Sequence, residues 1–457
     1  MAVHPIDFEL QADAYSTPEL RAIFDERARL SHWLRFEAAL AETQGELGVI
    51  PQASAACIVE TAAVERLDLD AIRKGYQISR NSVIPVLKAL RIACGSEHGE
   101  FVHHGATTQD VVDTGLMLEL RDALAVVTRD LRSVETGLLA LAERHRATPM
   151  IGRSHGQQAI PITFGMKAAI WLAEIRRHIE RLKRVASDAL FGQFGGAVGT
   201  LAALAERGPQ VKQRLMSKLG LNHSLQPWHT ARDNVAEICS VLTMATVSQA
   251  KIANEVFELG RTEFGELREP GGIPGAMSSS TMPHKRNPVL CQRIVVLASH
   301  VRSLLSVVME AMLQQNERDP RALWSEWLAV PQIAVYAGTA TTYLDQVVNG
   351  LEVFPEDMLR NLNLHGDLVA SEWLMFRLAG KIGKVKAQKV LHRAGEVAAE
   401  KRLSLVEILR ADSEIGSVLN DDDLTVALQP ELYSGMAASI VDVTLGAVRS
   451  ARATESA

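Results

Sequence analysis

The feature that most constrains the fold is a pair of long apolar stripes with helical spacing. In both stripes the members recur alternately three and four residues apart, and all but Gln249 are apolar. The stripes consist of Leu120, Leu124, Val127, Leu131, Val134, Leu138 and Leu141, and of Val235, Ile238, Leu242, Ala245, Gln249, Ile252, Val256 and Leu259. This spacing places each set on one helix face and suits near-parallel packing. Because both stripes exceed the average helix of about 11–12 residues, the sequence predicts a bundle of long helices.

Two more long helices and two flanking regions complete the predicted organisation. We expect helices over residues 163–184 and about 289–315, so residues 112–350 form the long-helix bundle. Shorter helical segments, interrupted by glycine and proline, are expected in residues 1–111 and 351–457. Aromatic residues make up only 5% of the chain, and strand signals are scarce. The sequence therefore predicts an all-α protein of three helical domains. Part of the apolar stripes is expected to serve an oligomer interface.

Charge and cysteine usage argue against several classes of protein. The net charge is −6 without a lysine- or arginine-rich run, whereas a nucleic-acid-binding surface needs a basic excess. The four cysteines form no CxxC pair, which argues against a disulfide framework or a zinc site. They are Cys57, Cys94, Cys239 and Cys291. The sequence has no apolar leader and no uninterrupted apolar run of about 18 residues. We expect a cytoplasmic protein that binds neither nucleic acid nor membrane.

Polar chemistry is concentrated in four clusters at the edges of the long apolar helices. The clusters are residues 102–114 (VHHGATTQDVVDT), 152–165 (GRSHGQQAIPITFG), 278–288 (SSSTMPHKRNP) and 316–327 (NERDPRALWSEW). Each also has an ordinary structural explanation. Thr107 or Thr108 would cap a helix with Asp110 in its first turn, and His155 alone would be a structural histidine. The occurrence of all four clusters in one chain favours a functional site.

The residue types in these clusters suit carboxylate binding and acid–base chemistry. Threonine and asparagine donate hydrogen bonds to carboxylates, and lysine adds positive charge. A loop serine becomes a base when backbone N–H groups and a lysine stabilise its alkoxide, and a histidine then serves as the acid. The chain has no GxSxG motif around Ser279, no GxxxxGK(S/T) motif and no HExxH-like spacing. An acyl-enzyme hydrolase, a nucleoside triphosphatase and a metal enzyme are therefore not indicated.

The segment SSSTMPHKRNP, within residues 270–288, resembles the signature loop of the fumarase/aspartase superfamily, GSSxMPxKxN. The serine pair, the Met-Pro pair, the lysine and the asparagine agree in order, and the other clusters match along nearly the whole chain. The resemblance implies three largely helical domains with a central five-helix bundle. It also implies a homotetramer with a twenty-helix core and active sites shared by three subunits. The implied substrate is a small carboxylate, without a cofactor or metal.

The resemblance also assigns roles to residues of this chain. Ser279 is expected to be the base that removes a proton next to a carboxylate, and His155 the histidine that acts as the acid. The loop backbone, Lys285 and Asn287 are expected to stabilise the negative charge that develops on the carboxylate. The remaining expected substrate-binding residues are His103, Thr107, Thr108, Gln109, Ser154, Gln157, Ser280, Met282 and Arg318. Closure of the loop would exclude water from the site.

Two positions depart from the family pattern. Ser278 replaces the signature glycine, which leaves the loop less conformational freedom. Gln292 stands where many members carry a glutamate that pairs with the catalytic histidine. A neutral amide does not raise the basicity of an imidazole as a carboxylate does. His155 is therefore expected to be a weaker base, or an acid with another partner.

The segment MPHKRNP places the resemblance in the branch of adenylosuccinate lyase and 3-carboxy-cis,cis-muconate cycloisomerase. Adenylosuccinate lyases hold a nucleotide phosphate with an Arg-Tyr pair near the N-terminus, where this chain has Ala14 and Tyr15. They add serines and an arginine after ERD, where this chain has Leu323, Trp324 and Trp327. The segments WSEW and PWHTARD are most similar to the cycloisomerase. The favoured hypothesis is an enzyme that interconverts 3-carboxymuconate and its muconolactone.

Other hypotheses stay open. Relatives of this type also release fumarate from N-substituted aspartates, so a C–N lyase is the second hypothesis and adenylosuccinate lyase itself the third. A non-catalytic helical scaffold is an alternative of a different class. The presence of Ser279, Lys285, Asn287 and His155 speaks against the scaffold.

Overall fold

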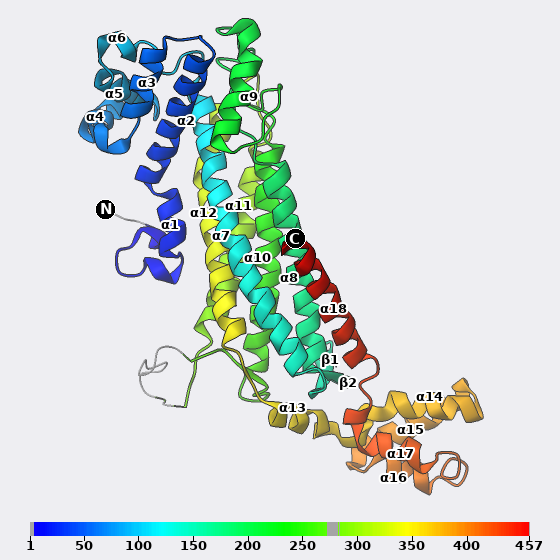
Figure 1. The fold of residues 1–457 in the computed structure, drawn as a ribbon. Coiled ribbons are helices and arrows are strands. Elements are labelled where there is room, and N and C mark those ends of the chain that lie inside the picture. Colours follow the sequence, from blue (N-terminus) through cyan, green and yellow to red (C-terminus); the bar gives the residue numbers. More distant parts are fainter. Residues whose placement is uncertain (1–3, 272–281, 283, 457) are drawn as a thin grey trace. The chain divides into compact units, whose positions relative to one another are not determined.

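The computed structural model describes residues 4–271, 282 and 284–456, and most of these residues are helical (Figure 1). The chain divides into two compact units. The first unit consists of Met1–Leu131, His178–Ala250 and Arg293–Tyr343, and the second of Arg132–Arg177, Lys251–Gln292 and Leu344–Ala457. The prediction of an all-α protein is confirmed. The predicted domain boundaries near residues 111 and 350 stay a prediction.

The four predicted long helices are present in the structure: Thr108–Arg144 for α7, Phe164–Asp188 for α8, Asp233–Leu259 for α10 and Val289–Glu310 for α11. A fifth long helix, Pro320–Asn349 (α12), was not predicted individually and lies within the region 112–350 assigned to the bundle. Within the described ranges, each of the five has residues in both units. Every member of the two apolar stripes is buried, the first stripe in α7 and the second in α10. The spacing argument therefore identified the core-facing sides of both helices correctly.

The other elements of the first unit are mostly short helices. They are η1 (Pro5–Asp7), η2 (Ala12–Ala14), α1 (Pro18–Phe24), α2 (Glu26–Glu46), α3 (Gln52–Thr61), η3 (Val64–Arg66), α4 (Leu69–Ser79), α5 (Ile84–Ala93), α6 (Gly95–Gly99), η4 (Ala205–Arg207) and α9 (Gly208–Leu219). The longest, α2, begins at a cap in which the Asp25 carboxylate accepts the N–H of Ala28 at 2.8 Å. Its buried face holds Trp33 and Phe36 and one carboxylate, that of Glu37.

The second unit adds two short antiparallel strand pairs and the C-terminal helices. These elements are β1 (Pro149–Ser154), β2 (Gln157–Thr163), β3 (Leu267–Arg268), β4 (Glu352–Val353), α13 (Pro355–Leu362), η5 (Asn363–Ala370), α14 (Ser371–Ile382), α15 (Lys384–Lys401), α16 (Leu405–Ala411), α17 (Asp421–Leu428), η6 (Pro430–Leu432) and α18 (Ala437–Ser456). β1 pairs with β2, and β3 with β4. The β1–β2 hairpin was not expected from the sequence, and it carries a candidate catalytic residue.

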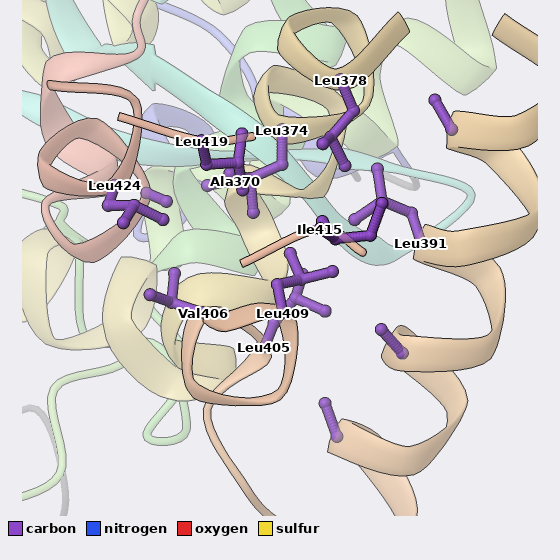
Figure 2. Packing of buried hydrophobic residues seen from close by; sticks show 14 residues of the cluster. Ala370, Leu374, Leu378, Leu391, Leu405, Val406, Leu409, Ile415, Leu419 and Leu424 are labelled. Carbon is purple, nitrogen blue, oxygen red and sulfur yellow. The ribbon is translucent and has the colours of Figure 1, made fainter. Parts of the chain in front are cut away.

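A separate hydrophobic core holds α14 to α17 together (Figure 2). Figure 2 shows side chains of α14, α15 and α16 in this core, among them Leu374, Leu391 and Leu409. The buried carboxylate of Asp367 accepts the N–H groups of Leu405 at 3.0 Å and Val406 at 2.7 Å. These two bonds satisfy free donors in the first turn of α16. The C-terminal helices of the second unit thus have their own apolar core and a buried helix cap.

Candidate active site

The predicted substrate-binding turn before α7 is held by the buried carboxylate of Asp110. Its oxygens accept the N–H of Thr107 at 3.0 Å, the N–H groups of Gly195 and Gly196, both at 3.0 Å, and the Nε2–H of His229 at 2.9 Å. Asp110 thus lies in the first turn of α7, as expected, and its side chain accepts the N–H of the residue before the helix. The same carboxylate also ties the start of α7 to a glycine-rich loop and to a histidine far away in the sequence.

Arg318 lies against the same turn in the first unit. Its Nη1 donates to Oγ1 of Thr107 at 2.8 Å, and its Nε donates to Oε1 of Gln109 at 3.1 Å. Gln109 is buried and Arg318 is partly exposed. The structure thus brings together three of the predicted substrate-binding residues. The neighbouring Thr108 side chain makes no hydrogen bond within the described part of the chain.

His103, just before this turn, has a buried carboxylate partner. Its Nδ1 lies 2.7 Å from Oε1 of Glu37, which is on α2. A carboxylate at one ring nitrogen orients the imidazole and decides which nitrogen carries the proton. His103 also has a φ of 67°, an uncommon conformation for a residue with a side chain. Sequence reasoning missed Glu37, although a lone carboxylate among the buried apolar residues of α2 was the available signal.

Behind the turn lies a buried ion cluster made of Asp113, Arg232 and Glu326. The Arg232 guanidinium donates to both oxygens of Asp113, at 2.8 and 3.0 Å, and its Nε donates to Glu326 at 3.0 Å. Burial alone would lower the pKa of Arg232, but the two carboxylates outweigh it and the pKa is raised. Burial raises the pKa of Glu326 against the opposing charge of Arg232. The ion cluster joins the second turns of α7 and α12 to the residue before α10.

Ser154, His155 and Gln157 lie at the tip of the β1–β2 hairpin in the second unit. Ser154 pairs with Gln157, which leaves His155 and Gly156 as the two turn residues. Their φ values are 54° and 75°, the combination required by a tight hairpin turn of type I′. The left-handed conformation costs an L-residue about 1–2 kcal/mol. His155 is therefore held exposed in a strained turn, as residues at functional sites often are.

The end of β1 next to this turn is held by the buried carboxylate of Glu266. Arg153 donates to both of its oxygens, at 2.6 and 2.9 Å, and the guanidinium lies 4.7 Å from the Phe264 ring centroid. The side-chain amide of Asn361 donates to the same carboxylate at 2.8 Å. An isolated two-stranded hairpin is marginal in water, so these contacts hold the strand that leads to His155.

The candidate base Ser279 and the neighbouring Ser280 lie outside the described residues. Of the signature loop, Met282 and Lys285 are exposed and Asn287 is partly buried, all in the second unit. The N–H of Lys285 donates to the carbonyl of Met282 at 3.1 Å. The predicted site residues therefore fall into two groups. One is the turn with Arg318 in the first unit, and the other is the hairpin with the loop in the second.

The described residues contain no group of three or more His, Cys, Asp or Glu side chains arranged to hold a metal ion. All four cysteines are free thiols. The described residues do provide Arg318, which is held by a threonine and a glutamine. They also provide two histidines at positive φ, His103 and His155. Such groups bind carboxylates and transfer protons.

Comparisons with known proteins agree with this chemistry. A family model described as lyase matches residues 13–303, and one described as adenylosuccinate lyase C-terminus matches residues 367–444. The N-acetyl-S-(2-succino)cysteine lyase of Enterococcus italicus is 37% identical over 98% of this chain and 98% of that protein. The 3-carboxy-cis,cis-muconate cycloisomerase of Pseudomonas aeruginosa is 39% identical, covering 95% of both chains. The adenylosuccinate lyase of Pyrococcus horikoshii is 38% identical over 96% of this chain and 97% of that protein.

A solved structure shows the same fold. The 3-carboxy-cis,cis-muconate lactonizing enzyme from Pseudomonas putida superposes with a TM-score of 0.89 at 37% identity, covering 95% of this chain and 98% of that chain. The fold and the matches define an enzyme of the lyase and cycloisomerase class. The chain belongs to the fumarase/aspartase superfamily, in the branch that includes adenylosuccinate lyases and 3-carboxy-cis,cis-muconate cycloisomerases.

Proposed function

We propose that this chain is a cofactor-independent cycloisomerase that interconverts 3-carboxy-cis,cis-muconate and its lactone. The observation that carries the proposal is Arg318, which Thr107 and Gln109 hold at a partly exposed position suited to a carboxylate. At the positions where adenylosuccinate lyases are expected to carry serines and an arginine, α12 has Leu323, Trp324 and Trp327. Apolar side chains there suit a compact polycarboxylate better than a nucleotide phosphate.

The proposed chemistry is proton transfer next to a carboxylate. In the direction of lactone formation, a carboxylate oxygen of the muconate adds to one carbon of a double bond and the adjacent carbon takes a proton. In the reverse direction Ser279 removes that proton, and the C–O bond breaks. Lys285 and Asn287 stabilise the charge that develops on the carboxylate, and His155 acts as the acid that donates a proton to the departing carboxylate oxygen as the C–O bond breaks. These roles follow from the family resemblance and the residue chemistry.

A second candidate function is the release of fumarate from a succinylated amine or thiol. Two relatives of similar identity support it, the succinocysteine lyase of E. italicus and the adenylosuccinate lyase of P. horikoshii. Here a proton next to a carboxylate is removed, the C–N or C–S bond breaks, and the amine or thiol leaves with a proton. The base and the charge-stabilising groups are the same, so only the leaving group and its pocket differ.

A proton NMR time course with separate substrates tests the proposal. The substrates are 3-carboxy-cis,cis-muconate, N-acetyl-S-(2-succino)cysteine, an N-substituted aspartate and adenylosuccinate, each with the native chain and with Ser279→Ala. We expect lactone signals from the muconate and their loss in the variant. Fumarate signals without lactone would replace the first proposal by the second. Full turnover by Ser279→Ala would refute the role of that serine, and no turnover by either chain would favour the scaffold.

We further propose that the enzyme is a homotetramer that buries an exposed apolar face of α10 and α11. In the first unit this face includes Met244, Val247, Val295, Val296, Val307 and Met309. The other side of α11 is packed inside the unit through Ile294, Leu297, Val301 and Val308. An unpartnered apolar face of this kind marks an interaction site, and a second copy of this chain is the occupant we propose.

A lipid bilayer is the other possible occupant of this face. Among the described residues α11 is the one helix long and apolar enough to span a membrane. A third of its most apolar 18-residue segment is buried in the protein. Arg302 lies near its middle, and a charge there costs about 2.5–3.5 kcal/mol in a bilayer, which favours a protein partner. Light scattering after gel filtration should give four chains for the native protein and fewer for Val296→Glu. A detergent requirement would refute this assignment. The cytoplasmic location stays a prediction.

A further inference from the structure

A continuous chain of hydrogen bonds leads from the buried ion cluster to Arg318. Oδ2 of Asp113 accepts from Arg232 at 2.8 Å and from Nε2 of Gln109 at 3.1 Å. Oε1 of Gln109 in turn accepts from Nε of Arg318 at 3.1 Å. Asp113 has no exposed side-chain surface, and Gln109 is 3% exposed. All members lie in the first unit, so one compact body contains the whole chain of contacts.

The contacts of Gln109 admit only one orientation of its side-chain amide. Both N–H donors of Nε2 are used, one on Asp113 and the other on the carbonyl of His229 at 2.9 Å. A flipped amide would face these two acceptors with its oxygen and would face Arg318 with an NH2 group. Two of the contacts would then bring two acceptors together, and the third would bring two donors together. The two buried acceptors therefore force the amide oxygen toward Arg318.

This orientation fixes the guanidinium of Arg318. Its Nε is bound by Gln109 and its Nη1 by Thr107. Within the described ranges Nη2 has no hydrogen-bond partner, and Arg318 remains partly exposed. A bound guanidinium with one free edge is suited to a carboxylate.

We propose that Asp113, itself clamped by Arg232, is a positioning residue that sets the Gln109 amide and thereby aims Arg318 at the substrate carboxylate. This inference rests on the proposed carboxylate-binding function and adds a residue that never touches the substrate. Arg232 prevents rotation of the Asp113 carboxylate, because it occupies both oxygens. Loss of the Asp113 acceptor is expected to loosen the Gln109 amide and, through it, the guanidinium of Arg318.

The substitution Asp113→Leu tests this inference. A leucine keeps the branching at Cγ but has no acceptor, so the Gln109 amide loses one of the two acceptors that orient it. Binding of tricarballylate, a non-reactive tricarboxylate, is measured by isothermal titration calorimetry. We expect its Kd to rise between about tenfold and a hundredfold, as the loss of one charge-assisted hydrogen bond predicts. On a substrate that the native enzyme turns over, KM should rise by a similar factor while kcat stays within about threefold.

The matched control is Glu326→Gln. It removes the same formal charge from the same buried ion cluster, and it has no bond to Gln109. Its Kd for tricarballylate should stay within about threefold of the native value. Equal weakening in both variants would mean that the ion cluster only stabilises the fold, which overturns the inference. Unchanged binding in Asp113→Leu would overturn it as well.

The design also keeps this inference apart from the proposed function. Tight tricarballylate binding that is lost in Asp113→Leu supports the positioning role, even if the muconate is not turned over. Failure of the native protein to bind tricarballylate refutes the carboxylate site itself. If Asp113→Leu does not fold, Gln109→Met keeps the shape but has no acceptor for Arg318. It should weaken binding at least about tenfold, and unchanged binding would refute the chain of contacts.

Discussion

Lys212 on α9 offers a sharp test of the electrostatics around the site. It is 2% exposed, and its Nζ makes one long hydrogen bond, 3.4 Å from the carbonyl of Gln226. Burial lowers its pKa from 10.5 to about 8, although the nearby Asp110 acts in the opposite direction. A buried ammonium with so few partners is costly. Lys212→Met keeps the chain length and removes the charge, so it should stabilise the fold at neutral pH.

The magnitude follows from the difference between the folded and unfolded pKa. A pKa lower by about 2.5, at 1.36 kcal/mol for each pH unit, corresponds to about 3 kcal/mol. Between about pH 8 and 10.5 the unfolded chain holds the Lys212 proton that the folded chain has lost. The free energy of unfolding of the native protein therefore rises with pH in that window. Below about pH 8 Lys212 is protonated in both the folded and the unfolded chain, so the full free-energy cost of burying its charge is present. The advantage of Lys212→Met should be about 3 kcal/mol at pH 7 and close to zero near pH 10.5.

Thermal unfolding at several pH values measures this advantage. An unfolding entropy of about 2.1 cal/mol/K per residue gives about 1 kcal/mol/K for 457 residues, so the expected gain in Tm at pH 7 is about 3 °C. Lys218→Met on the same helix is the control. Its hydrogen bond to Glu46 raises the pKa of Lys218, with Glu42 also contributing, so its charge is present throughout. The effect of the control should not change between pH 7 and 10. A gain for Lys212→Met that is equally independent of pH would refute the reasoning.

Three further predictions concern the C-terminal core, the His103 pair and the hairpin. Leu409→Ala, in the core shown in Figure 2, should destabilise the protein by about 2–5 kcal/mol in denaturant unfolding, and a loss below about 1 kcal/mol would contradict the packing. Glu37→Gln should lower kcat/KM at least about tenfold with little change in Tm, because His103 loses the carboxylate that orients it; an unchanged kcat/KM would exclude that role. Glu266→Gln should cost about 1–3 kcal/mol of stability, because Arg153 loses its bidentate partner; limited proteolysis at the hairpin provides the check, and native resistance would count against it.

The sequence by itself determined the helical scaffold. The stripes at Leu120–Leu141 and Val235–Leu259 predicted α7 and α10, and the expected helices at 163–184 and 289–315 correspond to α8 and α11. These predictions succeeded because helix periodicity is local: side chains three or four residues apart share a face whatever the rest of the chain does. The sequence also showed side chains suited to binding a carboxylate, and their role in binding stays a prediction.

The hairpin under His155 shows where local pattern failed. The sequence indicated only a polar cluster before the helix expected from residue 163, yet Gln157–Thr163 forms a strand paired with Pro149–Ser154. Its stability comes from Glu266, which lies more than a hundred residues away in the sequence. Without that partner the segment has only weak strand propensity, which context overrides easily.

The arrangement of polar side chains around Arg318 was decided by the tertiary structure alone. Asp113 and Arg232 are 119 residues apart, and Arg232 and Glu326 are 94 apart. No spacing rule joins such residues, because their pairing depends on how the helices that carry them pack. The pairing is nevertheless required once the fold forms, since a buried charge without a partner is too costly to keep. The sequence thus determined which helices form and which chemistry is present. The packing of those helices decided which charge holds which residue in place.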